Sequence, residues 1–294
     1  MRYASPLRYP GGKSKLSDFV KRLFRENHLG DGHYAEPYAG GASIALTLLY
    51  DEYASQVHIN DLDAAIHAFW NSALTDTESL SRLIRDTKVT PEEWARQREI
   101  QLHSEGKSAL ELGFSTFFLN RTNRSGIILS GGMIGGANQN GAWKLDARYN
   151  ATELAQRIEK IGRYRTRITL TNLDAADFLR NAAETLPERS LTYLDPPYYV
   201  KGQKRLYANY YKPEDHKGIA DILAGYPRPW MVSYDSAPEI LSLYQDYRQF
   251  VYTLPYTAAE RYKGSEVIVF SPNVLIPASL DGLSDVVAES EVAA

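Results

Sequence analysis

The sequence predicts an α/β fold, because strand and helix patterns alternate at both ends of the chain. Residues 33–36 form a short predicted strand, followed by a glycine-rich turn and an apolar helix through residues 44–49. A second strand over residues 57–61 completes a strand–helix–strand unit. The two strands of such a unit are expected to be parallel neighbours in one sheet.

The same kind of pattern returns in the second half of the chain. A helix through residues 219–223 separates two of the later predicted strands. We expect these strands to extend the first sheet. They cover residues 167–171, 191–195, 230–234 and 266–270.

The middle of the chain differs from both ends, because apolar residues recur there at helical spacing. A segment rich in Gly, Asn and Ser over residues 125–141 predicts loops around a hairpin. We therefore expect a sheet domain interrupted by a mainly helical insertion that contains a hairpin. The expected boundaries are 1–64 with 165–278 for the sheet domain, 65–164 for the insertion and 279–294 for an acidic tail.

The composition excludes several classes of site. The chain has 294 residues, 44% of them hydrophobic, and no cysteine. Disulfides, thiolate zinc sites and cysteine nucleophiles are therefore excluded. The six histidines show no ligand spacing, so no metal is expected. The chain also shows no signal-peptide core and no run long enough to cross a bilayer, which favours a cytoplasmic protein without membrane contact.

Charge is unevenly distributed along the chain. The formal net charge of −3 argues against a non-specific nucleic-acid binder, but basic residues gather in three runs. These runs lie within residues 1–25, 157–167 and 201–205, each beside a candidate site motif. A solvated surface would explain any single run, whereas all three together favour a substrate with a phosphate backbone.

The segment Asp195-Pro196-Pro197-Tyr198 follows a predicted strand and carries the strongest chemical signal. Two prolines make a stiff turn at the carboxyl end of a strand, where open α/β sheets bind ligands. Asp195 and the carbonyl of Pro196 can accept both hydrogens of a planar amino group, which leaves the nitrogen lone pair free to attack a sulfonium methyl group. Tyr198 offers a face on which a base can stack. The alternative is a strand-end turn with an incidental acid.

Two earlier segments fit a ligand pocket. Residues 36–43 form a glycine-rich turn that begins at Glu36, and this acid suits a cationic or hydroxyl-bearing ligand better than a pyrophosphate. Asp61 ends the next predicted strand, where acids accept hydrogen bonds from ribose hydroxyls or cap the following helix. Gly12-Lys13-Ser14 matches half of a phosphate-binding loop. That loop needs Gly where Leu7 stands, so triphosphate hydrolysis is rejected.

These segments, in this order, resemble the Dam-type (D12 class) adenine-specific DNA methyltransferases, from Leu7 to about Phe270. The resemblance implies a Rossmann-like methyltransferase sheet with helices on both faces and S-adenosylmethionine as cofactor. It also implies methyl transfer to N6 of an adenine flipped out of duplex DNA. The catalytic residues implied are Asp195, Pro196 and Tyr198. The cofactor-binding residues implied are Tyr9, Lys13, Glu36, Pro37, Tyr38, Gly40, Asp61, Asp177, Phe178 and Asp195.

In that family the helical insertion is the target-recognition domain. Arg pairs with guanine, and Asn or Gln pairs with adenine, in the major groove. The sequence departs from Dam in its turn, Gly40-Gly41-Ala42, and in the hairpin of residues 130–143, so GATC specificity does not transfer. The candidate DNA-binding residues are Arg121, Asn123, Arg124, Asn138, Gln139, Asn140 and Lys144.

Other readings of the substrate and partners stay open at this point. The same amino-group chemistry would serve RNA adenine or cytosine N4, and a catalytically inactive DNA-binding module is a further alternative. Double-stranded DNA is the expected partner. A cognate restriction endonuclease, as in restriction-modification, is a candidate second partner, and the chain is expected to be a monomer or weak dimer.

Overall fold

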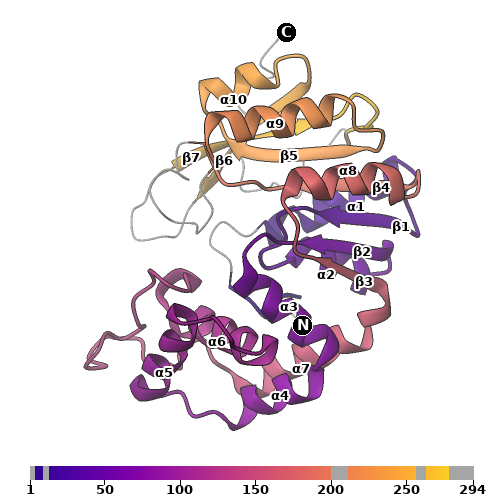
Figure 1. Ribbon diagram of the computed structural model, residues 1–294. Coiled ribbons are helices and arrows are strands. Elements are labelled where there is room, and N and C mark those ends of the chain that lie inside the picture. Colours follow the sequence, from indigo (N-terminus) through magenta and orange to yellow (C-terminus); the bar gives the residue numbers. More distant parts are fainter. Residues whose placement is uncertain (1–3, 9–12, 200–210, 256–262, 278–294) are drawn as a thin grey trace. The chain divides into compact units, whose positions relative to one another are not determined.

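The computed structural model describes residues 4–8, 13–199, 211–255 and 263–277 (Figure 1). Contacts divide the chain into two compact units. The sheet unit contains Lys13–Leu62 and Leu173–Ala294, and the helical unit contains Met1–Gly12 and Asp63–Asn172. Among the described residues, no helix combines the length and apolar character that a membrane span requires.

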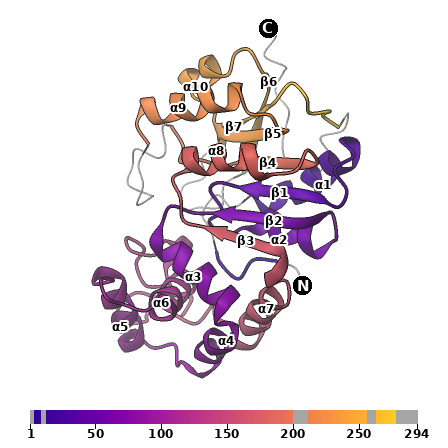
Figure 2. The same ribbon diagram turned by 45° about the vertical axis from the view of Figure 1, so that its right-hand side comes forward.

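Seven strands form one sheet in the order β3-β2-β1-β4-β5-β7-β6 (Figure 2). Neighbouring strands from β2 to β5 are parallel, whereas β7 runs antiparallel to both β5 and β6. This confirms the predicted α/β fold. The strands are β1 (Gly32–Glu36), β2 (Ala54–Asn60), β3 (Ile168–Thr171), β4 (Ser190–Leu194), β5 (Trp230–Asp235), β6 (Arg248–Pro255) and β7 (Lys263–Phe270).

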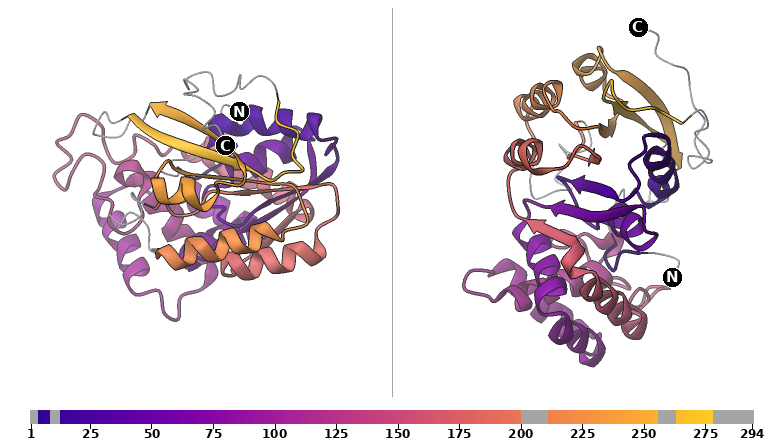
Figure 3. Two further views of the ribbon diagram at one scale, coloured as in Figure 1. Left: turned by 90° about the horizontal axis from the view of Figure 1, so that it is seen from above. Right: turned by 90° about the vertical axis from the view of Figure 1, so that its right-hand side faces the viewer.

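Helices of the sheet unit cover both faces of its sheet, as the right-hand view of Figure 3 shows. On one face, Phe19 of α1 packs against Phe270 of β7 and Phe24 packs against Tyr34 of β1. The opposite face carries a continuous core from α8, α9 and α10, and every residue of β4 and β5 is buried. These helices are α1 (Ser17–Glu26), α2 (Ser43–Tyr50), α8 (Ala175–Thr185), α9 (Pro213–Ala224) and α10 (Pro238–Leu243).

The helices of the helical unit begin at residues that the sequence marks well. Thr90 caps α5 through the amide of Glu93, with Pro91 in the first turn. Ser108 and Glu111 form a capping box at the start of α6. The helices are α3 (Ala64–Thr75), α4 (Thr77–Asp86), α5 (Pro91–Leu102), α6 (Ala109–Thr122) and α7 (Ala151–Arg163).

The glycine-rich segment after α6 consists mainly of loops and tight turns. Among its described residues, the ladder pairing is a single antiparallel bridge between Asn123 and Met133. Gly135, Gly136 and Gln139 take left-handed backbone angles, with φ of 84°, 75° and 50°. Such angles fold the chain back on itself in tight turns and interrupt any extended ladder.

The segment before Lys13 groups with the helical unit, because its backbone is hydrogen-bonded there. The amide and carbonyl of Arg8 pair with the side chain of Asn120 at 2.7 Å each, and Arg157 donates to the carbonyl of Ser5 at 2.8 Å. The basic run around Arg157 is therefore partly a structural feature, because this side chain is 6% exposed.

Candidate active site

The polar residues of the sheet unit gather where its parallel strands end. Glu36 ends β1, Asp61 follows β2, Asp195 follows β4 and Asp235 ends β5. Parallel strands present their carboxyl ends at one edge of a sheet, which is where ligands bind in open α/β folds. Because β7 runs antiparallel, its residue Glu266 lies directly opposite Asp235 at the same edge.

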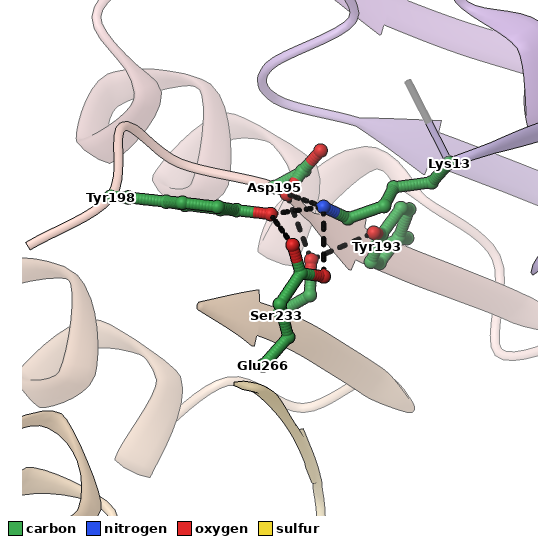
Figure 4. A network of polar contacts seen from close by, with 6 residues as sticks. All are labelled: Lys13, Tyr193, Asp195, Tyr198, Ser233 and Glu266. Atoms are coloured by element: carbon green, nitrogen blue, oxygen red, sulfur yellow. Dashed lines mark hydrogen bonds and ion pairs between the residues drawn. The ribbon is translucent and has the colours of Figure 1, made fainter. Parts of the chain in front are cut away.

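Lys13 is the centre of a buried polar network (Figure 4). Its Nζ contacts the hydroxyl of Tyr198 and lies 3.4 Å from Oδ1 of Asp195 and 3.2 Å from Oε2 of Glu266. The Tyr198 hydroxyl in turn donates to Oε1 of Glu266 at 2.6 Å. The network thus joins the segment before α1, the turn after β4 and strand β7.

Asp195 is held by its neighbours but is open on one side. Ser233 of β5 donates to its Oδ1 at 2.8 Å, and the hydroxyl of Tyr193 lies 2.8 Å from the Ser233 oxygen. The side chain of Asp195 is 26% exposed, whereas Ser233 is fully buried. Within the described part of the chain, the contacts of this carboxylate engage Oδ1, so Oδ2 can accept a hydrogen bond from a substrate.

The ionisable groups of this network shift one another's pKa values. Burial disfavours the ammonium of Lys13, but Asp195 and Glu266 outweigh this effect and raise its pKa. Burial raises the pKa of Asp195, opposed by Lys13 and assisted by Glu266. A carboxylate with a raised pKa is a better proton acceptor.

The glycine-rich turn leads directly into α2 and is braced by two acids. Gly40 and Ala42 take left-handed angles, both with φ of 45°, and the Gly40 amide donates to Oδ2 of Asp61 at 2.8 Å. Glu36 is buried and accepts bonds from the Tyr34 hydroxyl at 3.0 Å and the Ala45 amide at 3.2 Å. Burial raises the pKa of Glu36 to about 8.

Asn60 ties together three segments of this edge. Its side-chain amide donates to the carbonyls of Pro37 at 2.9 Å and Leu173 at 3.0 Å, and its carbonyl oxygen accepts from the Leu173 amide at 2.9 Å. Asn60 is fully buried. It therefore fixes the segment before α8 against the turn after β1. Tyr38, next to Pro37, is placed by a 2.9 Å contact between its hydroxyl and that of Tyr211.

A cavity of about 530 Å³ lies beside this edge, which is within the usual range for small-molecule sites. Leu62 and Asp174 line it at the ends of two loops, and Tyr211 and Ile219 line it from the other side. Its charged lining residues are three acids and one arginine, Arg180, so the lining disfavours a ligand that carries phosphates. The charged residues of the wall are Asp174, Arg180, Glu214 and Asp215.

The family is decided by a comparison with family models. The model of the D12 class N6 adenine-specific DNA methyltransferases matches residues 9–259. The chain belongs to this family. It is an adenine-specific DNA methyltransferase, and its methyl donor is S-adenosylmethionine.

Solved structures resemble the methyltransferase only distantly. A candidate RNA methyltransferase from Pyrococcus horikoshii is 9% identical, with TM-score 0.40, over 90% of this chain and 86% of that one. A candidate class I S-adenosylmethionine-dependent methyltransferase from Listeria monocytogenes is 10% identical, with TM-score 0.38, over 90% of this chain and 62% of that one, so less than two thirds of its length is spanned. A Legionella pneumophila protein is 11% identical, with TM-score 0.38, over 97% of this chain and 98% of that one. No curated protein sequence matches the chain.

The structure places most sequence-predicted cofactor residues of the methyltransferase at one edge of the sheet unit, with two differences. Asp177 is exposed and pairs with Arg180, and Phe178 is packed in the core, 6% exposed. Asp174, which caps α8, lines the cavity instead. Tyr9 lies outside the described residues.

Three of the predicted DNA-binding residues brace the helical unit internally. Asn123 is fully buried; its oxygen accepts from the Trp94 indole at 2.6 Å, and its amide donates to the carbonyls of two loop residues at 2.8 Å. Gln139 likewise donates to two loop carbonyls and accepts from the Leu145 amide at 2.8 Å. Arg121 donates to the Arg148 carbonyl at 2.8 Å. Their hydrogen-bonding groups hold the loop in shape.

The other four predicted DNA-binding residues are exposed on the loop that follows α6. Lys144 donates to the carbonyl of Gln139 at 2.7 Å and keeps its remaining donors toward solvent. These residues are Arg124, Asn138, Asn140 and Lys144.

Sequence reasoning missed four residues that shape the site of the methyltransferase. Ser233 and Glu266 lie within predicted strands. The sequence signal for them is a polar residue in an otherwise apolar strand. Asn60 precedes the predicted acid Asp61 and resembles an ordinary strand end. Asp174 is three residues before the predicted Asp177, and its position as a helix cap would have indicated it. Within the described residues, no group of three metal-ligating side chains occurs.

Proposed function

We propose that this methyltransferase acts on adenine flipped out of duplex DNA, with Asp195, Pro196 and Tyr198 holding the base. The observation that carries the proposal is the one-sided engagement of Asp195, whose Oδ1 is fixed by Ser233 and faces Lys13, so that Oδ2 can accept from a substrate amino group. The carbonyl of Pro196 would accept the second amino hydrogen. A base can reach such a strand-end pocket only by leaving the duplex.

The chemistry asked of these residues is limited. Bound S-adenosylmethionine supplies an electrophilic methyl group on a sulfonium. Asp195 and Pro196 hold both amino hydrogens, so the lone pair of N6 is drawn out of conjugation with the ring. As N6 bonds to the methyl carbon, the carbon–sulfur bond would break and its electron pair would pass to sulfur, so that neutral S-adenosylhomocysteine leaves. The Asp195 carboxylate would stabilise the positive charge that develops on N6. The surplus proton of N6 then has Oδ2 as its nearest acceptor.

Two acids at the strand ends, together with the lining of the neighbouring cavity, fit the methyl donor. We assign the ribose hydroxyls to Asp61 and the cationic amino-acid end to Glu36, because a carboxylate accepts hydrogen bonds and favours a nearby positive charge. Leu62 offers an apolar surface for the adenine ring beside Asp174. The acidic lining of the cavity agrees with a ligand that carries a net positive charge at sulfur and nitrogen and no phosphate.

For DNA we assign the helical unit as the binding surface. Arg8, Arg121, Arg148 and Arg157 lie close enough together that burial and mutual repulsion lower the pKa of Arg121 to about 9. Glu153 is the acid that opposes this repulsion in the described part of the unit. Arg121 and Arg157 are bonded within the unit, so their charges add to its positive field and exposed side chains would make the contacts to DNA phosphate, the anion that the family's substrate provides. The exposed loop residues Arg124, Asn138, Asn140 and Lys144 would contact base edges or adjoining phosphates.

The proposal is tested by incubating the protein with labelled S-adenosylmethionine and matched duplex DNA, single-stranded DNA and RNA. The expected product is N6-methyladenine in duplex DNA. Asp195→Ala is expected to abolish turnover while binding DNA and cofactor. Preferential methylation of RNA or of cytosine N4 would replace the proposed substrate, and an inactive wild-type protein that binds both ligands would indicate a DNA-binding module instead.

A further inference from the structure

Glu266 is a carboxylate at the active-site edge that the proposed chemistry does not use. It lies on β7 and is fully buried. A buried carboxylate is costly to desolvate, so its partners must compensate for lost water. Both of its oxygens are engaged: Oε1 accepts from the Tyr198 hydroxyl at 2.6 Å, and Oε2 lies 3.2 Å from Nζ of Lys13 (Figure 4).

The contacts of Glu266 fix the direction of Tyr198. The hydroxyl at the tip of this side chain is held by Glu266 and Lys13, and the residue is 8% exposed. A ring anchored at its far end cannot change its side-chain rotamer without breaking those contacts. In the proposed function, the Tyr198 ring is the face against which the base stacks, so its orientation decides where the base can lie.

The same carboxylate fixes Lys13 relative to Asp195. The ammonium lies between Oε2 of Glu266 at 3.2 Å and Oδ1 of Asp195 at 3.4 Å, and its side chain is 4% exposed. One ammonium is thus shared by two carboxyl groups. Loss of Glu266 would leave Lys13 with Asp195 as its single carboxylate partner and would draw the ammonium toward the residue that must accept the substrate.

We propose that Glu266 is a positioning residue for methyl transfer, which holds the Tyr198 ring and the Lys13 ammonium in place around Asp195 before the base enters. This inference rests on the proposed function of Asp195 and Tyr198. Glu266 is buried behind the residues that would touch the substrate and acts through them. Misplacement of such groups by about 1 Å is sufficient to cost ~100-fold in rate, so a buried support can matter as much as a contact residue.

The test compares Glu266→Gln with wild type in a single-turnover assay at saturating S-adenosylmethionine and DNA. Glutamine has nearly the same volume and can still accept from Tyr198, but its amide nitrogen would face Lys13, donor against donor. We expect the rate constant to fall roughly 10- to 100-fold, with cofactor and DNA dissociation constants changed less than about 3-fold. Glu266→Asp, which keeps the charge, is expected to retain more of the rate than glutamine.

A double-variant cycle with Tyr198→Phe separates positioning from general stability. If Glu266 acts through Tyr198, the two substitutions together slow the reaction less than the product of their separate effects. Ser271→Ala is the matched control. Ser271 is also buried, 2% exposed, and follows the same strand, where its hydroxyl bonds Asn273 at 2.6 Å. This variant is expected to lower the melting temperature and leave the rate constant unchanged.

The outcomes separate this inference from the function on which it rests. An active wild type whose rate is matched within 2-fold by both Glu266 variants would overturn the positioning role alone. Effects that simply multiply with Tyr198→Phe would also overturn it. If the glutamine variant does not fold, the aspartate variant carries the comparison. A wild type that transfers no methyl group would instead overturn the proposed function.

Discussion

The hydroxyl of Ser233 donates a 2.8 Å hydrogen bond to Oδ1 of Asp195, from the middle of β5 to the turn that follows β4. Ser233 is itself in contact with the Tyr193 hydroxyl, also at 2.8 Å. The acid of the strand-end turn is therefore oriented by a side chain that the sequence motif does not contain. In the proposed function, this orientation leaves Oδ2 for the amino group of the substrate.

Removal of the Ser233 hydroxyl is expected to slow catalysis more than it weakens binding. In Ser233→Ala the Asp195 carboxylate loses one fixed partner and samples other rotamers, so we expect kcat to fall about 10-fold, the cost of one hydrogen bond to a charged group. Tyr193→Phe serves as the comparison, because it removes only the outer contact and should cost less than about 3-fold. Equal rates for wild type and Ser233→Ala would contradict the orienting role.

Asp61 is expected to contribute mainly to cofactor affinity. Asp61→Ala removes a charged acceptor for the ribose and the anchor of the Gly40 amide, so the dissociation constant of S-adenosylmethionine should rise ~10- to 100-fold, measured by calorimetry. The nearby Asp63→Asn is the control, because Asn can still cap α3 as Asp63 does. An unchanged affinity in Asp61→Ala would remove this residue from the cofactor site.

Glu36 is expected to make the stability of the cofactor-free protein decrease with rising pH. Burial raises its pKa from 4.5 to about 8, so the folded protein retains a proton that the unfolded chain releases between those values. The contribution of this group is complete below pH 4.5 and is lost as the pH rises through 8. In Glu36→Gln, the glutamine oxygen can still accept from Tyr34 and Ala45, and no proton is involved.

Urea unfolding at pH 5, 7 and 9 measures this effect. The stability of Glu36→Gln relative to wild type should increase across that range, by an amount on the order of a few kcal/mol. If the difference in unfolding free energy between Glu36→Gln and wild type is the same at all three pH values, Glu36 is ionised in the folded protein. Saturating cofactor should reduce the difference, because a cation beside Glu36 favours its charged form.

Lys144 tests the assignment of DNA binding to the helical unit. Lys144→Ala should weaken binding to all duplex sequences alike and reduce the slope of log affinity against log salt by about 1, as loss of one phosphate contact does. Lys107 is similarly exposed but lies before α6, outside the loop, so Lys107→Ala should leave both quantities unchanged. A salt slope unaffected by Lys144→Ala would place the phosphate contacts elsewhere.

Six of the seven strands could be predicted from the sequence because they are short apolar runs, four of which end in an acid or are followed by one; β6 is the strand that the sequence analysis does not predict. β4 and β5 are buried throughout, and the residues that follow or end them, Asp195 and Asp235, lie at the ligand-binding edge. Helices that bury narrow stripes were harder to recognise: α1 packs Phe19 and Phe24 inside between charged residues and was not predicted. The apolar residues of α1 can be recognised as a buried stripe only when the face that packs against the sheet is known.

The supporting residues of the site could not be predicted because they depend on the order of strands. Glu266 reaches Lys13 only because β7 inserts antiparallel between β5 and β6, a pairing that no local pattern indicates. Asn60 joins segments more than 100 residues apart through Leu173. In the same way, Asn123 and Gln139 have the side chains of base-reading residues, but the fold of the loop uses their hydrogen bonds internally.

The most direct test of the account is base-resolution mapping of N6-methyladenine in DNA from cells that express the protein, compared with cells that express Asp195→Ala. We expect methylated adenines within one recurring sequence context for the wild type, and none above background for the variant. Wild-type DNA without N6-methyladenine, or equal methylation with Asp195→Ala, would contradict it.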